Sequence, residues 1–286
     1  MLRRGVVSMA DASKRIRMID IGGNVGDGMF EGIYRGKRVH ESDWAAVKER
    51  AVRVGVERII VTVGCEEDLK AVDALVHREG VGESPALFMT VGCHPTRANE
   101  MDKGHEQYLT RLAEYAEKAN SGGAGRRVVA VGELGLDYDR LHFCTKEVQL
   151  RNFERQFWLA ERLRLPLFLH MRECADDFLT VVRRNRHRFG LGVVHSFTGS
   201  FEEAEKIMEL GLYIGVNGCS LKTAENVEVV ARIPLARMCI ETDCPYCDIR
   251  RTHASFPHVQ TTFPSKKKER HDPTATVKGR NEPAGL

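Results

Sequence analysis

The sequence predicts an α/β protein folded as a (β/α)8 TIM-like barrel. Eight short apolar runs, most of them continuous and not alternating, are typical of parallel strands buried on both faces. Segments of helical periodicity separate these runs, and the pattern fits within 286 residues, the length of one large domain. The predicted strands are Met18–Asn24, Arg58–Gly64, Leu87–Pro95, Val128–Asp137, Pro166–Arg172, Gly192–Phe197, Tyr213–Gly218 and Met238–Asp243.

Two of the intervening helices carry clear signals. Leu150, Phe153 and Phe157 recur at positions i, i+3 and i+7, which gives one apolar stripe along a helix. Ser200, followed three residues later by Glu203, predicts a capping box at the start of another helix. A doubly wound open sheet is the competing architecture. The absence of a G-x-G-x-x-G phosphate fingerprint after the first strand disfavours it.

Both ends of the chain differ from the barrel pattern. We expect a flexible basic N-terminus (1–17) and one barrel domain (18–286); a short mitochondrial presequence is the less favoured interpretation of the basic start. The C-terminal segment (244–286) is irregular and basic, so the last helical segment of the barrel is expected to be missing. We expect this segment to fold back over the last strand, a partner chain to cover it, or the protein to be unstable; complete self-cover is least favoured.

Composition narrows the class of protein. Apolar residues make up 42% of the chain and charged residues 29%, as in a soluble protein with a sizeable core, and no apolar run is long enough to cross a bilayer. The net charge of +3 is compatible with a polyanionic substrate. The eight scattered cysteines, without a secretory leader, predict reduced thiols in the cytoplasm or nucleus. The C-x-x-C spacing of Cys244 and Cys247 allows a redox pair or half a zinc site, but we interpret them as loop cysteines.

Ligand-type side chains stand where the predicted strands end. In a barrel of this class, functional side chains lie at the C-terminal ends of the strands and therefore converge. The residues at these ends are Asp20, Asn24, His94, Glu133, His170, His195 and Asp243. Imidazoles and carboxylates suit Mg²⁺, Mn²⁺ or Zn²⁺. We therefore expect at most two divalent ions, which could activate water for attack on a phosphodiester.

Six motifs, in uninterrupted order, resemble the TatD family, and two further stretches resemble its eukaryotic branch. The six are Met18–Asn24, Val91–Pro95, Gly132–Asp137, His170–Arg172, Val194–Gly199 and Glu241–Pro245; the two are Gly32–Gly36 and Asn217–Thr223. The resemblance implies a barrel of the metallo-dependent hydrolase type. It also implies a metal-dependent deoxyribonuclease, often a 3′–5′ exonuclease on single strands. The sequence leaves the choice between DNA and RNA open.

The resemblance also implies roles for individual residues. The implied metal ligands are Glu133 (bridging), His170, His195 and Asp243, and the implied catalytic residues are Glu133, Asp243 and His94. Arg172, Asn24 and Asp137 are the implied substrate-binding residues, with Arg172 offering a phosphate its fork of donors. Many relatives have an H-x-H pair where this chain has Gly22 and Asn24, so one ion should bind weakly.

Two other functions remain open at this point. An amidohydrolase or deacylase would use the same end of the barrel, commonly with a carboxylated lysine on the fourth strand, where this chain has Glu133. An inactive nucleic-acid-binding relative is the other. Five aromatic residues in or near the predicted loops are candidates for stacking on unpaired bases: Phe30, Tyr34, Tyr138, Phe143 and Tyr246.

Overall fold

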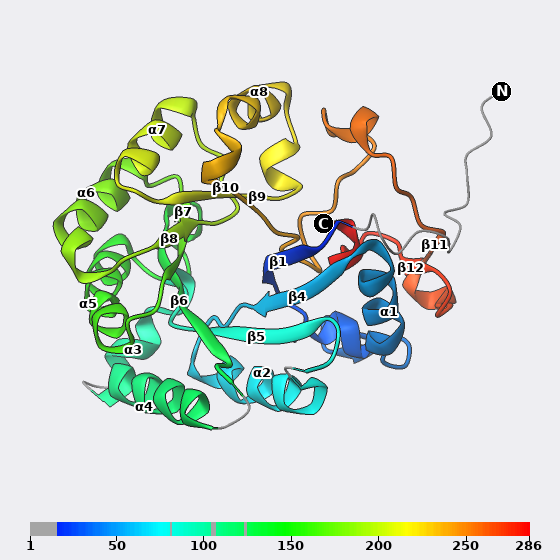
Figure 1. Ribbon diagram of the computed structural model, residues 1–286, viewed down its shortest axis with the longest axis horizontal. Helices are drawn as coiled ribbons and strands as arrows, with labels where there is room; N and C mark the ends of the chain where they lie inside the picture. The colour runs from blue at the N-terminus through cyan, green and yellow to red at the C-terminus, as the bar shows by residue number, and fades with distance from the viewer. Residues whose placement is uncertain (1–15, 81, 104–106, 123–124) are drawn as a thin grey trace.

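The computed structural model describes residues 16–286 apart from 81, 104–106, 123 and 124. The predicted flexible N-terminus and presequence therefore lie almost wholly outside the described residues. Eight parallel strands form one sheet that curves into a nearly closed barrel, in the order β1-β4-β5-β6-β7-β8-β9-β10 (Figure 1). The predicted fold class is confirmed.

Each barrel strand coincides with one of the eight apolar runs. The strands are β1 (Met18–Gly23), β4 (Val56–Val61), β5 (Ala86–Val91), β6 (Val128–Asp137), β7 (Leu167–Arg172), β8 (Gly192–Val194), β9 (Tyr213–Val216) and β10 (Met238–Ile240). Nearly every residue of β5, β6 and β7 is buried, as expected of strands covered on both faces. Several predicted strands were too long at their C-terminal ends, because those residues leave the sheet to form the loops that carry the site.

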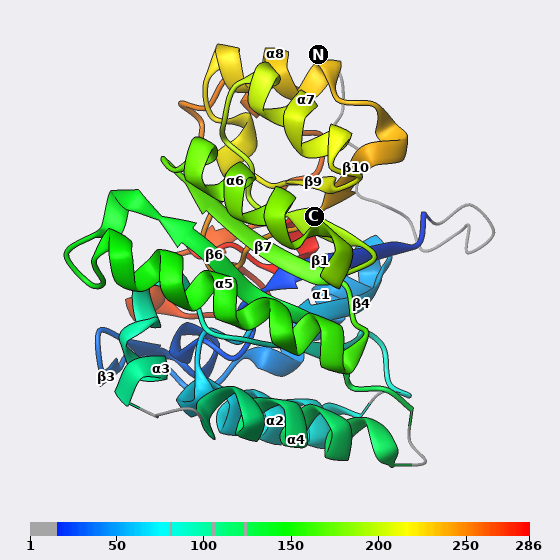
Figure 2. The same ribbon diagram turned by 90° about the vertical axis from the view of Figure 1, so that its left-hand side faces the viewer.

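Helices surround the sheet on its outside (Figures 1 and 2). They are α1 (Trp44–Val54), α2 (Glu66–Glu79), α3 (Asn99–Lys103), α4 (Gln107–Ser121), α5 (Lys146–Leu163), α6 (Ala175–Asn185), α7 (Phe201–Glu209) and α8 (Ala224–Arg232). The predicted stripe lies on α5, where Phe153 and Phe157 are buried, and the predicted capping box of Ser200 and Glu203 begins α7. None of the described helices is both long and apolar enough to span a membrane.

The barrel closes at the C-terminal ends of its strands. β10 pairs with β9, and no ladder between β10 and β1 is formed by the described residues. Instead, the backbone nitrogen of Asp243 donates to the Gly22 carbonyl at 2.8 Å, and that of Asn24 donates to the Cys244 carbonyl at 2.7 Å. Two of the predicted site residues are therefore held beside each other by the closure itself.

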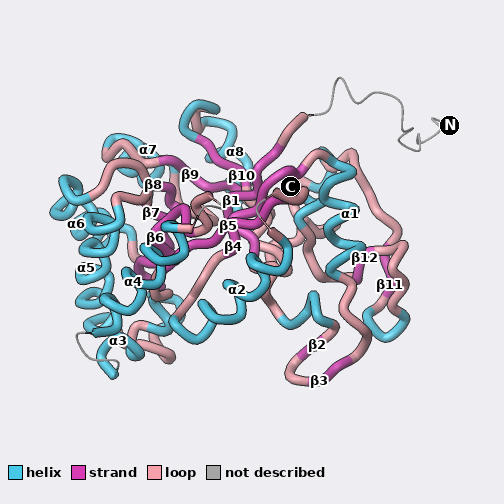
Figure 3. The backbone as a smooth tube through the Cα atoms, turned by 60° about the horizontal axis from the view of Figure 1, so that its bottom comes forward, coloured by secondary structure: helices cyan, strands magenta, loops and turns pink. Residues whose placement is uncertain are grey.

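The segment after β10 folds back over α1 and also contacts β4 (Figure 3). It contains the short strands β11 (Ser265–Lys266) and β12 (Thr276–Val277), and it ends in a 3-10 turn, η10 (Pro283–Gly285). Buried Arg280 pairs with Asp43 and with Glu282. The side-chain amide of Asn281 donates to the Thr242 carbonyl at 2.9 Å, and this hydrogen bond joins the segment to the loop that follows β10.

The outer surface at the β10–β1 junction remains partly open. Ile240 on β10 is 42% exposed, Ile19 on β1 is 40% exposed, and Leu235, just before β10, is 86% exposed. As expected from the absence of a helix after β10 in the described chain, apolar side chains at this junction contact water. The C-terminal segment covers α1 and leaves β10 without a full cover.

Candidate metal centre

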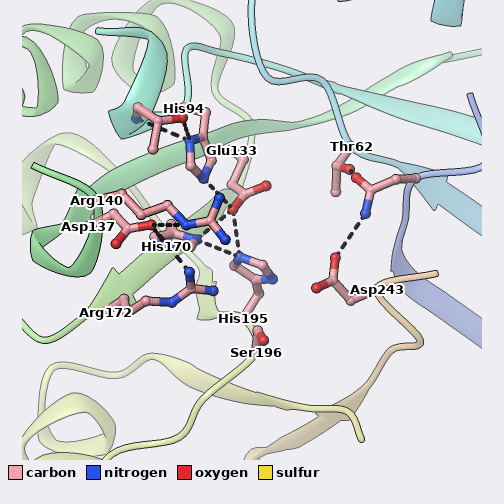
Figure 4. Close-up of polar contacts among 12 residues, drawn as sticks. Thr62, His94, Glu133, Asp137, Arg140, His170, Arg172, His195, Ser196 and Asp243 are labelled. Atoms are coloured by element: carbon pink, nitrogen blue, oxygen red, sulfur yellow. Dashed lines mark hydrogen bonds and ion pairs between the residues drawn. The ribbon is translucent and has the colours of Figure 1, made fainter. Parts of the chain in front are cut away.

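The centre of the site is one carboxylate oxygen surrounded by imidazole nitrogens. Oε1 of Glu133, on β6, lies 2.6 Å from Nδ1 of His170, on β7. The same oxygen lies 2.8 Å from Nε2 of His195, which follows β8, and these two ring nitrogens are 3.1 Å apart. Three predicted metal ligands therefore meet at one point, although they come from three different strands (Figure 4).

The far side of each ring is held by a second carboxylate. Nε2 of His170 lies 3.2 Å from Oδ2 of Asp137, and Nδ1 of His195 lies 3.4 Å from Oε1 of Glu241. Each outer nitrogen therefore donates its proton away from Glu133, and the inner nitrogen presents a lone pair when the ring is neutral. Carboxylates that orient ligating histidines in this way are usual around protein-bound metals.

The electrostatics of this cluster fit a cation. Burial alone would raise the pKa of Glu133, but His195 and His94 hold it well below its usual range. Burial alone would lower the pKa of His195, but Glu133 and Glu241 raise it well above its usual range. The cluster therefore keeps a proton between Glu133 and the inner ring nitrogens, because these atoms would otherwise face one another with lone pairs only. A divalent ion could replace this proton, so the donor set fits the metal that the resemblance implies.

His94 lies beside the cluster in a different role. Its Nε2 is 3.3 Å from Oε1 of Glu133, close enough for a shared ion. Its Nδ1, however, accepts hydrogen bonds from the backbone nitrogen of Thr96 at 3.1 Å and from the Thr96 hydroxyl at 2.7 Å. The neutral ring must therefore carry its proton on Nε2, which suits a donor to a phosphate oxygen better than a metal ligand.

Asp243 lies on the opposite side of Glu133 from Asp137 (Figure 4), and it forms a second group with Asn24. The Asn24 amide donates to Oδ1 of Asp243 at 2.9 Å, and Asn24 in turn accepts a hydrogen bond from Thr62. Burial raises the pKa of Asp243 to about 6. Among the described residues, no hydrogen bond or ion pair joins Asp243 to the imidazoles. The structure therefore places Asp243 and Asn24 at the same rim, as a separate pair.

Two guanidinium groups lie over Asp137. Nη1 of Arg172 is 3.5 Å from Oδ2 of Asp137, and Nε of Arg140 is 3.9 Å from the same oxygen. About a third of the Arg172 side chain is exposed, so its remaining donors face solvent. Asp137 was predicted to bind substrate. It contacts His170 and both arginines, and these contacts suit a residue that positions the His170 ring and the two guanidinium groups.

Three of the residues in this network were missed at the level of sequence. Buried Glu241 accepts a hydrogen bond from the backbone nitrogen of Ser196 at 2.5 Å and from the Asn217 amide at 3.3 Å. Its position two residues before Asp243 was the available signal, because alternate residues of a strand share a face. The Glu241 carboxylate has room there because residue 22 is a glycine, whose added Cβ would lie 2.7 Å from Oε2 of Glu241. Arg140 and Asn217 carried no comparable signal.

A second group of ligand-type side chains lies beside α1. His40, Asp43 and His271 approach one another closely enough to share an ion. The rings of His40 and His271 are stacked, however, with centroids 4.2 Å apart and planes only 7° from parallel. A metal must lie near the plane of each ligating ring, and parallel stacked rings have no such common point. Asp43 is also engaged by Arg280, so we assign no metal here.

Sequence comparisons agree with this geometry. A family model described as TatD related DNase matches residues 34–280. The chain belongs to the TatD-related DNase family. This confirms the resemblance seen in the six motifs, and the ligand-type residues of those motifs are the ones that the barrel brings to a single rim.

Two curated relatives and one solved structure show how far the likeness extends. The deoxyribonuclease Tat-D of Schizosaccharomyces pombe is 43% identical over 277 residues, covering 94% of this chain and 86% of that protein. The 3′-5′ ssDNA/RNA exonuclease TatD of Escherichia fergusonii is 30% identical over 233 residues, covering 80% of this chain and 79% of its own. The crystal structure of a TatD-family hydrolase from Entamoeba histolytica matches with a TM-score of 0.87 and 38% identity, covering 94% of this chain and 87% of that one.

Proposed function

We propose that this member of the TatD-related DNase family is a divalent-metal-dependent nuclease that removes nucleotides from the 3′ ends of single-stranded DNA. The observation that carries the proposal is the meeting of Glu133, His170 and His195 at one buried point, with an arginine pair beside it. The exonuclease named above supports the direction of cleavage and extends the candidate substrates to RNA.

Each group has a role in this reaction. One or two bound Mg²⁺, Mn²⁺ or Zn²⁺ ions would lower the pKa of the attacking water and neutralise charge on the phosphate. Glu133, His170 and His195 would hold the first ion, and Asp243 would complete the ligand set. With a pKa of about 6, Asp243 is mostly ionised at pH 7, so it can accept a proton from the attacking water while the Asn24 amide holds the carboxylate in place.

Substrate binding follows from the groups around this centre. The Nε2 proton of His94 and the free donors of Arg172 would bind phosphate oxygens. Phe143 and Tyr246 are 55% and 49% exposed, and each would stack on an unpaired base. Phe30 is 1% exposed and packs edge-on against Trp44, so its predicted stacking role is wrong.

The test is a product analysis on end-labelled single strands. With Mg²⁺ or Mn²⁺, a 5′-labelled strand should shorten one nucleotide at a time, while a 3′-labelled strand should release labelled mononucleotide at once. Chelation should abolish both. Glu133→Gln keeps the side-chain volume and removes the charge, so cleavage should fall at least about 100-fold. Glu154→Gln, on the exposed face of α5, is the matched control.

The alternatives give different results. An amidohydrolase or deacylase would hydrolyse small amides or esters and leave DNA intact. An inactive relative would bind the strand and release no product with any metal. Cleavage that persists in chelator, or a Glu133→Gln variant with more than about a tenth of wild-type activity, a loss below about 1.4 kcal/mol, would contradict the proposed mechanism.

A further inference from the structure

Two thiols lie side by side at the rim of the site, and the mechanism above does not use them. Cys219 begins the turn η6 (Cys219–Leu221) after β9, and Cys247 lies in the loop after β10. Their Sγ atoms are 2.7 Å apart without being bonded. Both are only partly buried, so small oxidants can reach them, whereas Cys244, the nearer cysteine in sequence, is buried. The C-x-x-C spacing therefore does not describe the pair that forms.

The backbone brings these thiols together. Gly218 stands where a Cβ would approach the Cys247 carbonyl oxygen to 1.9 Å, so only a glycine allows the two loops to be this close. Cys247 itself has a φ of +53°, a conformation that non-glycine residues adopt only when their surroundings hold them there. The backbone nitrogen of Cys219 donates to the Asn217 side chain at 2.9 Å. Both cysteines are thus fixed in place.

One of the thiols also contacts the reaction site. The Cys247 thiol donates to Oδ2 of Asp243 at 3.3 Å, and the other oxygen of this carboxylate accepts from Asn24. Within the described part of the chain, these two side-chain hydrogen bonds hold Asp243. Any reaction that removes the thiol proton leaves the carboxylate with one donor and more freedom to rotate.

We propose that Cys219 and Cys247 form a reversible disulfide in response to hydrogen peroxide, and that this modification slows the reaction by releasing Asp243 from its thiol donor. The bond itself is independent of the proposed nuclease function, and only its effect on cleavage rests on that function. In this role Cys247 is a positioning residue, because it acts through Asp243.

The chemistry balances with peroxide as the oxidant. The Cys247 thiol, whose single proton can turn from Asp243 to the neighbouring Cys219 sulfur, lowers the pKa of Cys219 to about 7, so Cys219 supplies the attacking thiolate. Its sulfur attacks one peroxide oxygen, the O–O bond breaks, and a sulfenic acid and water form. The Cys247 sulfur then attacks the sulfenyl sulfur, and its proton leaves with the displaced hydroxide as a second water. Two thiols and one peroxide thus give one disulfide and two waters, and an added dithiol reverses the reaction by exchange.

Three measurements on the full chain test the inference. Non-reducing peptide mapping after peroxide treatment should find a peptide joining Cys219 to Cys247, with an intact mass about 2 Da below the reduced chain. Mn²⁺ titration should show about tenfold weaker binding to the oxidised chain, the effect of one hydrogen bond to a charged group. Cleavage of labelled single-stranded DNA should fall by a similar factor, and dithiothreitol should restore both.

Variants separate this pair from general oxidation. Cys219→Ser should lose the disulfide and the reversible effects of peroxide on Mn²⁺ binding and cleavage. Cys239→Ser is the matched control, because Cys239 is equally half-buried but lies within β10, and it should respond like wild type. Absence of the Cys219–Cys247 peptide would overturn the inference, as would a disulfide that changes neither Mn²⁺ affinity nor cleavage. If the disulfide forms and weakens Mn²⁺ binding while the reduced chain cleaves no DNA, the proposed function fails and the modification site stands.

Discussion

At the scale of single residues, neighbouring carboxylates differ because their surroundings differ. Glu133 faces three imidazoles, which keep its pKa well below the usual range despite burial. Asp20, three residues before the end of β1, is fully buried, and no cationic side chain of the described residues pairs with it. Burial raises its pKa to about 7, although it accepts hydrogen bonds from Thr242 and Gly22. Both carboxylates lie within the six motifs, but only Glu133 lies in the candidate metal centre.

This difference predicts how Asp20→Asn changes stability with pH. The folded pKa of Asp20 lies above its unfolded value near 4, so its contribution to stability is present below pH 4 and is lost as pH rises through about 7. The asparagine of the variant does not ionise, so the variant keeps this stability as the pH rises. The melting temperature of the variant relative to wild type should therefore increase between pH 4 and 7 and stay at its higher value above that range. Asp139→Asn, at an exposed carboxyl, should show no such trend. A difference that is independent of pH would show that Asp20 stays ionised in the folded chain.

At the scale of elements, the loops after β9 and β10 depend on the glycine between them. Gly218→Ala would bring a methyl group to 1.9 Å from the Cys247 carbonyl oxygen, so the two loops must separate. Overpacking of this kind costs about 1–3 kcal/mol, and displacement of Asp243 by about 1 Å can slow catalysis about 100-fold. We expect both the melting temperature and the rate of cleavage to fall.

Gly190→Ala is the control for this change, because nothing lies within 4 Å of the added Cβ. The two variants should be purified and melted together, with cleavage rates taken well below either melting temperature. A Gly218→Ala protein with wild-type stability and turnover would mean that the loops adjust freely, and that their close approach has no role.

The sequence predicted those elements and site residues that depend on local patterns along the chain. Strand positions were readable because β5, β6 and β7 are buried on both faces and leave continuous apolar runs. His94, Glu133, His170 and His195 were readable because each ends such a run. Glu241 was missed because its contact with His195 joins the ends of β8 and β10, two strands that are not neighbours in the sheet. The pairing of Cys219 with Cys247 depends on loop geometry and left no signal in the spacing.

At the scale of the whole molecule, buried ion pairs hold the C-terminal segment against the barrel. Arg280 contacts both oxygens of Asp43 at 2.6 and 2.8 Å, and Glu282 is also bound by Arg50 at 2.7 Å. These partners are separated by more than 230 residues, which explains why a basic, turn-rich sequence gave no indication of how it would pack. Ion pairing thus holds this segment against α1, whereas a helix after β10 would have covered β10 itself.

Removal of Arg280 should therefore destabilise the entire fold. Arg280→Leu leaves Asp43 and Glu282 buried with one fewer partner, a change that costs about 3–5 kcal/mol and should lower the melting temperature by roughly 10 °C. Arg184→Leu, which removes an exposed pair with Glu154, should cost less than about 1 kcal/mol. Similar melting temperatures for the two variants would show that the segment is not held by this network.

Glu133, His170 and His195 are proposed to bind a divalent ion between them. Crystals soaked in Mn²⁺ and measured near the manganese absorption edge would locate such an ion. We expect an anomalous peak within bonding distance of Oε1 of Glu133, Nδ1 of His170 and Nε2 of His195, with any second, weaker peak on the side of Asp243. A site without a peak, or a strong peak only between His40 and His271, would contradict the proposal.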